Sequence, residues 1–553
     1  MRGLAQRAWS TADWVVILGG VLAAVPVLAD TVHAIDAGWT ASSDDGMIAL
    51  RAFDVISPRP PLVGQYSQSS PLIGQPVYSL GPMLYVLLAV PAHLGPRSLP
   101  LAMGAVNAAA VVGSVVLAAR RGGRPLALAT ALGLALTARA LPVEAGYEVW
   151  NCWAGLFPFS FLLFLAWSVA CGDHRLLPLL AVTASYVMQV HFTYVLPGLA
   201  AIAVAAGGLA LERRARPGRS MRRWVVAALV LTLACWAPPL VDQAVHRPGN
   251  LALAYRLATG DHPTAGVEPG WNTMSRAVGV VPWWVKRVRT PAERVLEPLH
   301  VPAHRSASTA AVLAVLVGLL AMAVRRRRHD LATAAVLALL LVLSMVAVAA
   351  AMPSGTLGLT AVGYALVWTI PAGMWVWLVV TWLAASLLAQ RGLAVARRGL
   401  DGPGALAAAG LACVGAAAVL VAAGRDYDDP QRLPPGLKDY RLIEATTEQV
   451  MDQLNGSRGV VLDVPVDVRN SLTFQSAIAY AARRQGLAIG VPPRLAREMG
   501  SQYRAGPGAF DRTIVVRDPG AVAVRGSRVV VRNRAVSVML MPWSPRPSRS
   551  FAD

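Results

Sequence analysis

Charged residues are scarce in this chain of 553 residues, of which only 14% are Asp, Glu, Lys or Arg and 55% are hydrophobic. The mean hydropathy is +0.51. This balance excludes a soluble protein of this size, because apolar runs long enough to cross a bilayer recur along most of the chain. Lysine occurs only as Lys286 and Lys438, so arginine supplies almost all of the positive charge.

Cysteine is also rare. The four cysteines lie in or at the ends of apolar segments, and none of them has the spacing of a metal site; they are Cys152, Cys171, Cys235 and Cys413. We therefore interpret them as small buried hydrophobic residues. The sequence indicates no certain cofactor, and it leaves a divalent cation open.

The net charge of +20 does not indicate a nucleic-acid partner. Most arginines cluster in short loops between apolar segments, where positive charge orients membrane helices toward the cytoplasm. The clusters are Arg120, Arg121 and Arg124; Arg213, Arg214, Arg216, Arg219, Arg222 and Arg223; Arg325 to Arg328; and Arg391, Arg397 and Arg398.

Placing every cluster in the cytoplasm requires an even number of crossings between successive clusters, and the apolar segments allow it. These segments are 14–28, 100–118, 125–141, 152–170, 176–190, 195–211, 224–240, 308–324, 331–351, 366–389 and 405–423. We predict a polytopic α-helical protein of a bacterial plasma membrane with about eleven spans. Its N-terminus is expected in the cytoplasm and its C-terminal part outside.

The polar chemistry then gathers on the outer side. The membrane domain 1–423 contributes the outer loops 30–99 and 242–307, and the tail 424–553 follows it. A transporter needs polar residues at mid-bilayer and often shows two related halves. The chain shows no convincing repeat and few charges within its spans, which disfavours a transporter.

An acidic pair, Asp44 and Asp45, lies near the start of the first outer loop. Residues 44–56 space their apolar side chains approximately as a helix does, which predicts a short amphipathic helix on the membrane surface. Either aspartate could cap that helix. The other use of such a carboxylate is as a general base held in a sheltered loop. The apolar stretch 78–91 is short, and the span count holds only if it does not cross.

Further polar residues lie at the outer ends of the predicted spans. A histidine there can bind a phosphate or a metal, although a lone histidine in an apolar context is more often a packing residue. Aromatic residues beside cations suit a lipid phosphate, with interfacial anchoring as the equal alternative. The residues are Glu148 and Asn151, Gln189 and His191, Asp242 and Arg256, and Lys286 after Trp283 and Trp284.

The tail has the composition of a small soluble α/β domain. Strands are predicted at 459–466, 487–491, 513–518, 521–526, 528–533 and 535–541, with a helix at 474–486. The tail shows no nucleophile elbow, phosphate loop or metal cluster. Acceptor binding and stabilisation both remain open as its role.

Four stretches, 44–55, 81–91, 148–151 with 189–195, and 238–257, resemble the GT-C class of membrane glycosyltransferases. This is the class of protein O-mannosyltransferases and aminoarabinose transferases, and the chain is most similar to an actinobacterial group within it. The resemblance implies a polyprenyl-phosphate-linked sugar as donor, and transfer at the outer face to a cell-envelope glycan, lipid or protein. It implies that the base is Asp44, with Asp45 as its neighbour. The group often has a histidine where this chain has Ser79, after Tyr78.

A single displacement by a deprotonated acceptor hydroxyl would invert the anomeric centre of a hexose or pentose. Positive charge is then needed beside the departing lipid phosphate, and the candidates are Arg51, His191, Arg256 and Lys286. Candidate substrate-binding residues are Tyr78, Ser79, Glu148, Asn151, Gln189 and Asp242. A lipid or polysaccharide transporter and a non-catalytic cell-envelope assembly protein are the alternatives.

Overall fold

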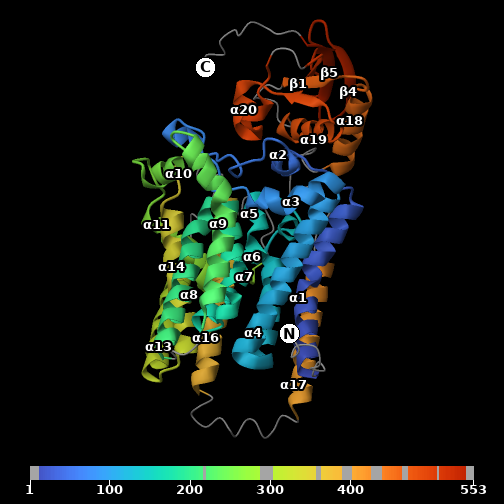
Figure 1. Ribbon diagram of the computed structural model, residues 1–553. Coiled ribbons are helices and arrows are strands. Elements are labelled where there is room, and N and C mark those ends of the chain that lie inside the picture. The colour runs from blue at the N-terminus through green and yellow to red at the C-terminus, as the bar shows by residue number, and fades with distance from the viewer. Residues whose placement is uncertain are drawn as a thin grey trace.

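The computed structural model describes residues 11–215, 220–286, 303–355, 363–388, 402–424, 439–463, 471–506 and 510–543. A bundle of apolar helices carries a small α/β domain at one end (Figure 1). We call this end of the bundle the domain end. The domain contains a five-stranded sheet with α18, α19 and α20 beside it, as detailed below.

Eight described helices are long and apolar enough to cross a membrane. The bundle consists of α1 (Thr11–Asp36), α4 (Ser98–Ala140), α5 (Asn151–Ala154), α6 (Leu156–Ala170), α7 (Leu177–Val190), α8 (Val195–Ala215), α9 (Arg222–Val245), α13 (Ala303–Arg325), α14 (His329–Ala350), α16 (Thr369–Leu388) and α17 (Gly402–Ala423). Every apolar segment singled out in the sequence falls on one of these helices, which confirms a polytopic helical architecture. The number that cross the membrane stays a prediction.

Helix α4 reverses direction in its middle. Gly122 and Gly123 leave the helical range, and Gly123 has a φ of 66°, which glycine adopts without strain. Asn107 in the first half donates from Nδ2 to the Gly146 carbonyl just beyond the second half, at 2.9 Å. Because residues 39 positions apart meet in this way, the two halves run antiparallel, as the predicted segments 100–118 and 125–141 require.

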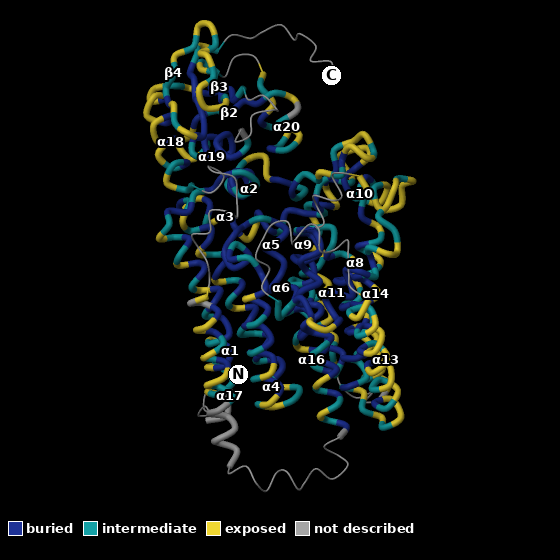
Figure 2. Tube along the Cα trace, turned by 180° about the vertical axis from the view of Figure 1, so that it is seen from behind, coloured by how far each residue is buried: buried dark blue, intermediate teal, exposed yellow. Residues whose placement is uncertain are grey.

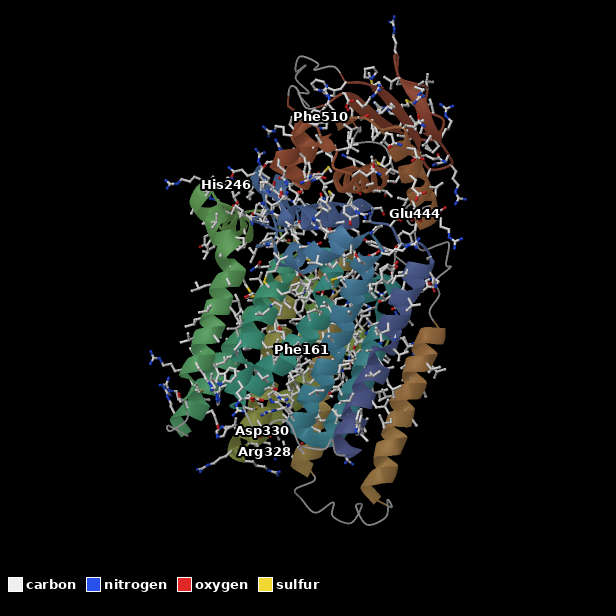
Figure 3. All side chains as sticks on the ribbon, turned by 45° about the vertical axis from the view of Figure 1, so that its right-hand side comes forward. Phe161, His246, Arg328, Asp330, Glu444 and Phe510 are labelled. Atoms are coloured by element: carbon white, nitrogen blue, oxygen red, sulfur yellow. The ribbon has the colours of Figure 1, made fainter. Side chains whose placement is uncertain are left out.

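Those arginines of the clusters that the structure describes lie at the end of the bundle opposite the α/β domain, which we call the arginine end; Arg216, Arg219, Arg391, Arg397 and Arg398 lie outside the described residues. Figure 3 shows Arg328 and Asp330 there, far from Phe510 and Glu444 at the domain end. Acidic partners accompany some of these arginines: Arg328 pairs with Asp330 at 2.8 Å, and Arg120 lies 3.6 Å from the Asp173 carboxylate. Gathering the clusters at one end is the arrangement that the charge pattern predicted.

The interior of the bundle is filled by aromatic and aliphatic side chains. Phe159 packs edge-on against Trp368 and Phe164 against Trp375, with ring centroids 5.9 and 4.9 Å apart. Figure 2 shows this interior as buried, while much of α13 is exposed. An uncovered apolar surface is expected where a helix has lipid as its neighbour.

Two short helices, α2 (Ser43–Phe53) and α3 (Met83–Leu94), lie between the bundle and the α/β domain. The other short elements are α10 (Asn250–Thr259) and α11 (Val267–Val278), together with the 3₁₀ turns η1 (Asp54–Ile56), η2 (Ser70–Ile73), η3 (Val143–Gly146), η4 (His174–Leu176) and η5 (Phe192–Tyr194), of which η4 lies after α6 at the arginine end. With 12 residues, α3 is too short to span. The sequence required this of the stretch 78–91.

The α/β domain has the strand order β2-β1-β3-β5-β4. Strand β1 pairs in parallel with β2 and β3, whereas β5 pairs antiparallel with β3 and β4. The elements are α18 (Tyr440–Asp452), β1 (Gly459–Asp463), α19 (Ser471–Arg484), β2 (Ala488–Gly490), α20 (Pro493–Met499), η9 (Ser501–Tyr503), β3 (Arg512–Arg517), β4 (Arg528–Arg532) and β5 (Ser537–Pro542). The predicted strand at 521–526 is wrong, because turns at Gly520 and Gly526, with φ of 80° and 81°, bracket that segment.

The amphipathic pattern of α2 predicted a helix on the membrane surface. In the structure, the helix is instead packed between two protein cores. Met47 and Leu50 belong to the core of the α/β domain, whereas Ile48, Ala49 and Ala52 belong to the core of the bundle. Protein therefore covers both faces of the helix, which lies between α3 and α19 (Figure 1).

A polar cluster around Asp54 fixes the far end of α2 to the α/β domain. The Asp54 carboxylate is 2% exposed and accepts from the Tyr503 hydroxyl at 2.7 Å, from Gln502 Nε2 at 2.8 Å and from Arg483 Nε at 3.3 Å. Arg51 Nη1 lies 3.5 Å away. Two arginines and two further donors thus converge on one buried carboxylate.

Replacing Asp54 with Ala is expected to loosen the α/β domain from the bundle. Removing one partner of a buried ion pair costs roughly 3–5 kcal/mol, because the remaining charges lose their counterpart. The melting temperature of the purified chain should fall, and limited proteolysis should release a C-terminal fragment. Asp518→Ala is the matched control: Asp518 is exposed, and its loss should change stability by less than about 0.5 kcal/mol. Equal stability of the two variants would contradict the anchoring role of Asp54.

Candidate functional site

The acidic pair, Asp44 and Asp45, lies in the first turn of α2. The residue that caps this helix is Ser42, and its side chain makes no capping hydrogen bond. The expectation that Asp44 or Asp45 serves as the cap is therefore wrong. Both carboxylates still benefit from the positive end of the helix dipole, since they stand within its first turn.

Asp44 belongs to a small buried hydrogen-bonded group. Its Oδ1 accepts from Gln65 Nε2 at 3.1 Å, and the Gln65 Oε1 accepts in turn from the Tyr85 hydroxyl at 3.3 Å. Part of the Asp44 side chain stays open to solvent, but protein atoms surround the rest. This burial raises the pKa of Asp44, and the hydrogen bond from Gln65 opposes the rise only in part. A carboxylate of raised pKa is a stronger base than an exposed one.

Aromatic and thiol groups lie within electrostatic reach of Asp44. Its charge acts on Tyr85, Cys152 and Tyr364 closely enough to help raise the pKa of Tyr364. The Tyr364 ring packs against Trp150, with centroids 4.9 Å apart. The carboxylate thus stands at an aromatic wall made by residues from three separate parts of the chain.

The predicted residues Tyr78 and Ser79 lie beside this group. Their strand-like segment pairs with the residues around Gln65: Ser79 N donates to the Gln65 carbonyl at 2.8 Å, and Gly64 N donates to the Ser79 carbonyl at 2.9 Å. The Tyr78 hydroxyl reaches the α/β domain, where it donates to the Arg497 carbonyl at 2.8 Å. Burial raises the pKa of Tyr78 to about 12, so this hydroxyl stays protonated.

Asn250 holds the Tyr78–Ser79 segment from the second outer loop. Its Oδ1 accepts from Tyr78 N at 2.8 Å, and its Nδ2 donates to the Tyr78 carbonyl at 2.9 Å. Asp242 supports Asn250 in turn, because Asp242 Oδ2 accepts from Asn250 N at 2.8 Å while Oδ1 lies 2.8 Å from His246 Nδ1. Both oxygens of Asp242 are thus engaged in holding the loop.

Gln189, Asn151 and His191 lie on the bundle side of the same region. Gln189 Oε1 stands so close to Gly81 that a Cβ on that glycine would lie 2.1 Å from it. Asn151 Nδ2 donates to the Val190 carbonyl at 3.2 Å, which fixes the chain just before His191. Burial lowers the pKa of His191 to about 4. The imidazole is therefore neutral at pH 7 and would contact a phosphate as a hydrogen-bond donor rather than as a cation.

Arg51 provides a cation near the centre of the group. It lies on the same face of α2 as Asp44, seven residues or about two turns further along. It stands 3.5 Å from the Asp54 carboxylate, and its charge lowers the pKa values of both Tyr78 and Tyr85 against the larger effect of burial. Among the predicted cations, Arg51 is the one whose charge acts on Tyr85, which is hydrogen-bonded to Gln65 of the Asp44 group.

The other predicted residues are more peripheral. Glu148 is buried near Tyr147, beside the contact with α18. Arg256 is exposed on α10, and Lys286 is half-buried after the Trp283–Trp284 pair, with its backbone N–H donating to the Trp283 carbonyl at 3.1 Å. Their roles stay predictions.

Four residues at the site had not been singled out for it from the sequence: Gln65, Tyr85, Asn250 and Tyr364. Gln65 lies in a proline- and glycine-rich loop where no periodicity marks it. Asn250 meets Tyr78 across 172 positions, so no local pattern connects them. The signal available for Asn250 was its position at the first turn of a helix.

A metal centre is not indicated by the described residues. They contain no group of three or more His, Cys, Asp or Glu side chains placed to share an ion. Asp242 has both of its oxygens committed to protein donors.

Replacing Asn250 with Ala is expected to release the Tyr78–Ser79 segment. The variant loses three hydrogen bonds to the backbone of Tyr78 and Ser79, and each group left unsatisfied away from water costs roughly 1–3 kcal/mol. Hydrogen exchange measured by mass spectrometry should speed up in the peptide that covers 77–80. Gln243→Ala is the control, because Gln243 holds Ala252 N in the same loop at 3.1 Å without touching Tyr78. Unchanged exchange at 77–80 in the Asn250 variant would refute the clamp.

No protein-family model matches the chain, and no curated protein matches it. Among solved structures, the chain is similar to ArnT from Cupriavidus metallidurans bound to undecaprenyl phosphate. The two chains are 14% identical, the match covers 96% of this chain and 98% of that one, and the TM-score is 0.47. The apo form of the same protein gives 12% identity, 93% and 97% coverage, and a TM-score of 0.44. The archaeal oligosaccharyltransferase AglB from Archaeoglobus fulgidus, in complex with an inhibitory peptide and a dolichol-phosphate, gives 12% identity, 92% and 70% coverage, and a TM-score of 0.34. Because all three scores are below 0.5, we base the proposed function on the site geometry.

Proposed function

We propose that the chain is a membrane glycosyltransferase that moves a sugar from a polyprenyl-phosphate donor to an acceptor hydroxyl, with Asp44 as the general base. One observation carries the proposal: a carboxylate of raised pKa stands at the junction of an apolar helical bundle and a polar domain. A donor with a lipid tail and a polar acceptor can meet only at such a boundary. The ArnT and AglB structures contain undecaprenyl phosphate and a dolichol-phosphate respectively.

The reaction needs a base because an acceptor hydroxyl is a poor nucleophile. Asp44 takes the hydroxyl proton as the oxygen attacks the anomeric carbon, and the bond from that carbon to the lipid phosphate breaks on the opposite face. The product is an inverted glycoside and a free polyprenyl phosphate. Gln65 holds the carboxylate in place through its amide N–H. This hydrogen bond uses Oδ1 and leaves Oδ2 of Asp44 for the acceptor hydroxyl.

The leaving phosphate gains negative charge as its bond to the sugar breaks, so donors near it stabilise the transition state. Arg51 supplies the positive charge, and neutral His191 supplies an N–H. Arg256 and Lys286 would guide the donor headgroup at the membrane surface. The Trp150–Tyr364 wall offers an aromatic face to the sugar ring.

The same proposal sets the orientation in the membrane. With the arginine end in the cytoplasm, the Asp44 group and the α/β domain face the exterior of a bacterial cell. The acceptor is then a cell-envelope glycan, lipid or protein, and the transferred sugar is a hexose or pentose.

Asp44→Asn should lower kcat by roughly 10²–10⁴-fold, the usual contribution of a general base. The amide keeps an oxygen for the Gln65 hydrogen bond but cannot accept a proton. The measurement is transfer of radiolabelled sugar from a panel of polyprenyl-phosphate sugars by the purified chain in lipid. Asp45→Asn, one residue away on the same turn, is the matched control and is expected to keep kcat within about tenfold. Full activity in both variants and in the double variant would eliminate the proposed base.

Transfer should also depend on the ionisation of Asp44. Because the pKa of Asp44 is raised, the active, deprotonated form accumulates at higher pH than for an ordinary aspartate, so kcat should climb with pH along a single ionisation limb. Stability should move the other way. A carboxyl whose pKa is higher in the folded than in the unfolded state makes a stability contribution that is lost as pH rises from the unfolded pKa through the folded pKa.

Asp44→Asn should therefore melt at a higher temperature than the wild type at pH 7, and the difference should vanish at pH values below 3.8. The melting curves are measured in one detergent across the pH range. A variant that melts below the wild type at pH 7 would show that the charged form of Asp44 is stabilised by its surroundings, contrary to the direction used here.

A further inference from the structure

A cavity lies beside Asp54, about 15 Å along α2 from Asp44, since ten residues at 1.5 Å per residue separate the two aspartates. Its volume is about 450 Å³, and it opens between the segment after α2 and the edge of the α/β domain at β2 and η9. Sites for small ligands usually occupy about 300–1,000 Å³. The cavity thus falls within the size range of small-ligand sites.

The charge that lines this cavity is predominantly positive. Its wall includes Arg59, Arg483 and Arg504, against the single carboxylate of Asp54. Asp54 is already occupied by Arg483, Gln502 and Tyr503. Arg59 and Arg504 are exposed and line the cavity, and neither makes an ion pair with a described residue, so their guanidinium donors are available to a ligand there.

One wall of the cavity is aromatic. The Phe510 ring lies directly over Gly490 of the β2 edge, where an added Cβ would come within 2.7 Å of it. The same ring is near Trp543, with centroids 6.1 Å apart. A flat apolar face beside planar donors is the combination that holds a sugar ring, whose C–H faces pack on the aromatic while its oxygens accept hydrogen bonds.

The cavity is poorly built for a peptide. A peptide would bind best by extending the sheet at β2, but that edge is already covered. Val491 N donates to the Tyr503 carbonyl at 2.7 Å, and Ala505 N donates to the Val491 carbonyl at 3.0 Å.

We infer that this cavity is a binding site for an acidic saccharide chain, with Arg59 and Arg504 contacting its carboxylate or phosphate groups and Phe510 contacting a sugar face. Binding itself is independent of the proposed transfer. Only its use, to hold the remote part of the acceptor while a terminal hydroxyl reaches Asp44, rests on the proposed function.

The test is direct binding of tetragalacturonate to the full-length chain in lipid nanodiscs, measured by calorimetry at low salt. Maltotetraose, a tetrasaccharide without acid groups, tests whether the acid groups are needed. Tetraglutamate, an acidic peptide, tests whether the saccharide is needed. Tetragalacturonate should bind best, and Arg59→Gln combined with Arg504→Gln should weaken it about tenfold or more, since charge-assisted hydrogen bonds to two guanidinium groups are lost. Arg525→Gln combined with Arg532→Gln removes the same charge near β4, at the opposite edge of the sheet, and should leave binding unchanged.

Asp44→Asn should bind tetragalacturonate as the wild type does, which separates this site from the proposed reaction. The inference is overturned if tetragalacturonate does not bind, if the two double variants lose affinity equally, or if Arg59 and Arg504 prove dispensable. Tighter or equal binding of tetraglutamate would assign the cavity to an acidic peptide instead. Loss of transfer in Asp44→Asn with no saccharide binding would retain the transferase and reject the second site.

Discussion

Helix α2 is shared by two hydrophobic cores, and the arrangement of the molecule depends on that sharing. Met47 and Leu50 pack into the α/β domain while Ile48, Ala49 and Ala52 pack into the bundle. Within a helix of 11 residues, one face therefore belongs to the core of the α/β domain and the opposite face belongs to the core of the bundle. The α/β domain cannot shift over the bundle without exposing one set or the other. Both ends of the helix, each with a carboxylate, are therefore held in fixed positions.

The two carboxylates at the ends of α2 are treated in opposite ways. Asp54 receives hydrogen bonds from Arg483, Gln502 and Tyr503, so its acceptor capacity serves structure. Among the described residues, only the Gln65 side chain donates a hydrogen bond to the Asp44 carboxylate, and burial raises the pKa of Asp44. A buried carboxylate that is incompletely satisfied is costly for the fold and remains basic. Such a cost is tolerated at a site where the proton affinity is used.

Much of this fold could be predicted from hydropathy alone, because burial in lipid demands helices with a length and polarity that a sequence displays directly. The position of the Asp44–Asp45 pair near the start of the first outer loop was readable for the same reason. The packing of protein against both faces of α2 could not be predicted in this way. An amphipathic pattern reveals one apolar face, whereas the second face of α2 packs through close approach: Ser476 of α19 lies so near Gly46 that a Cβ would come within 2.5 Å of its hydroxyl.

The clamp of Asn250 on Tyr78 was equally hidden, because side-chain bonds to the backbone of a distant loop follow no sequence period. Its consequence is physical. Tyr78 and Ser79 have no regular sheet to hold them beyond one short bridge to Tyr66, yet they contact both the Gln65 loop and the α/β domain. Asn250 supplies the missing strand-like partner, and Asp242 in turn fixes Asn250. A loop ordered from three sides can hold Gln65, and through it Asp44, in one geometry. Catalysis by a positioned base requires that constancy, since small displacements of a reacting group are costly in rate.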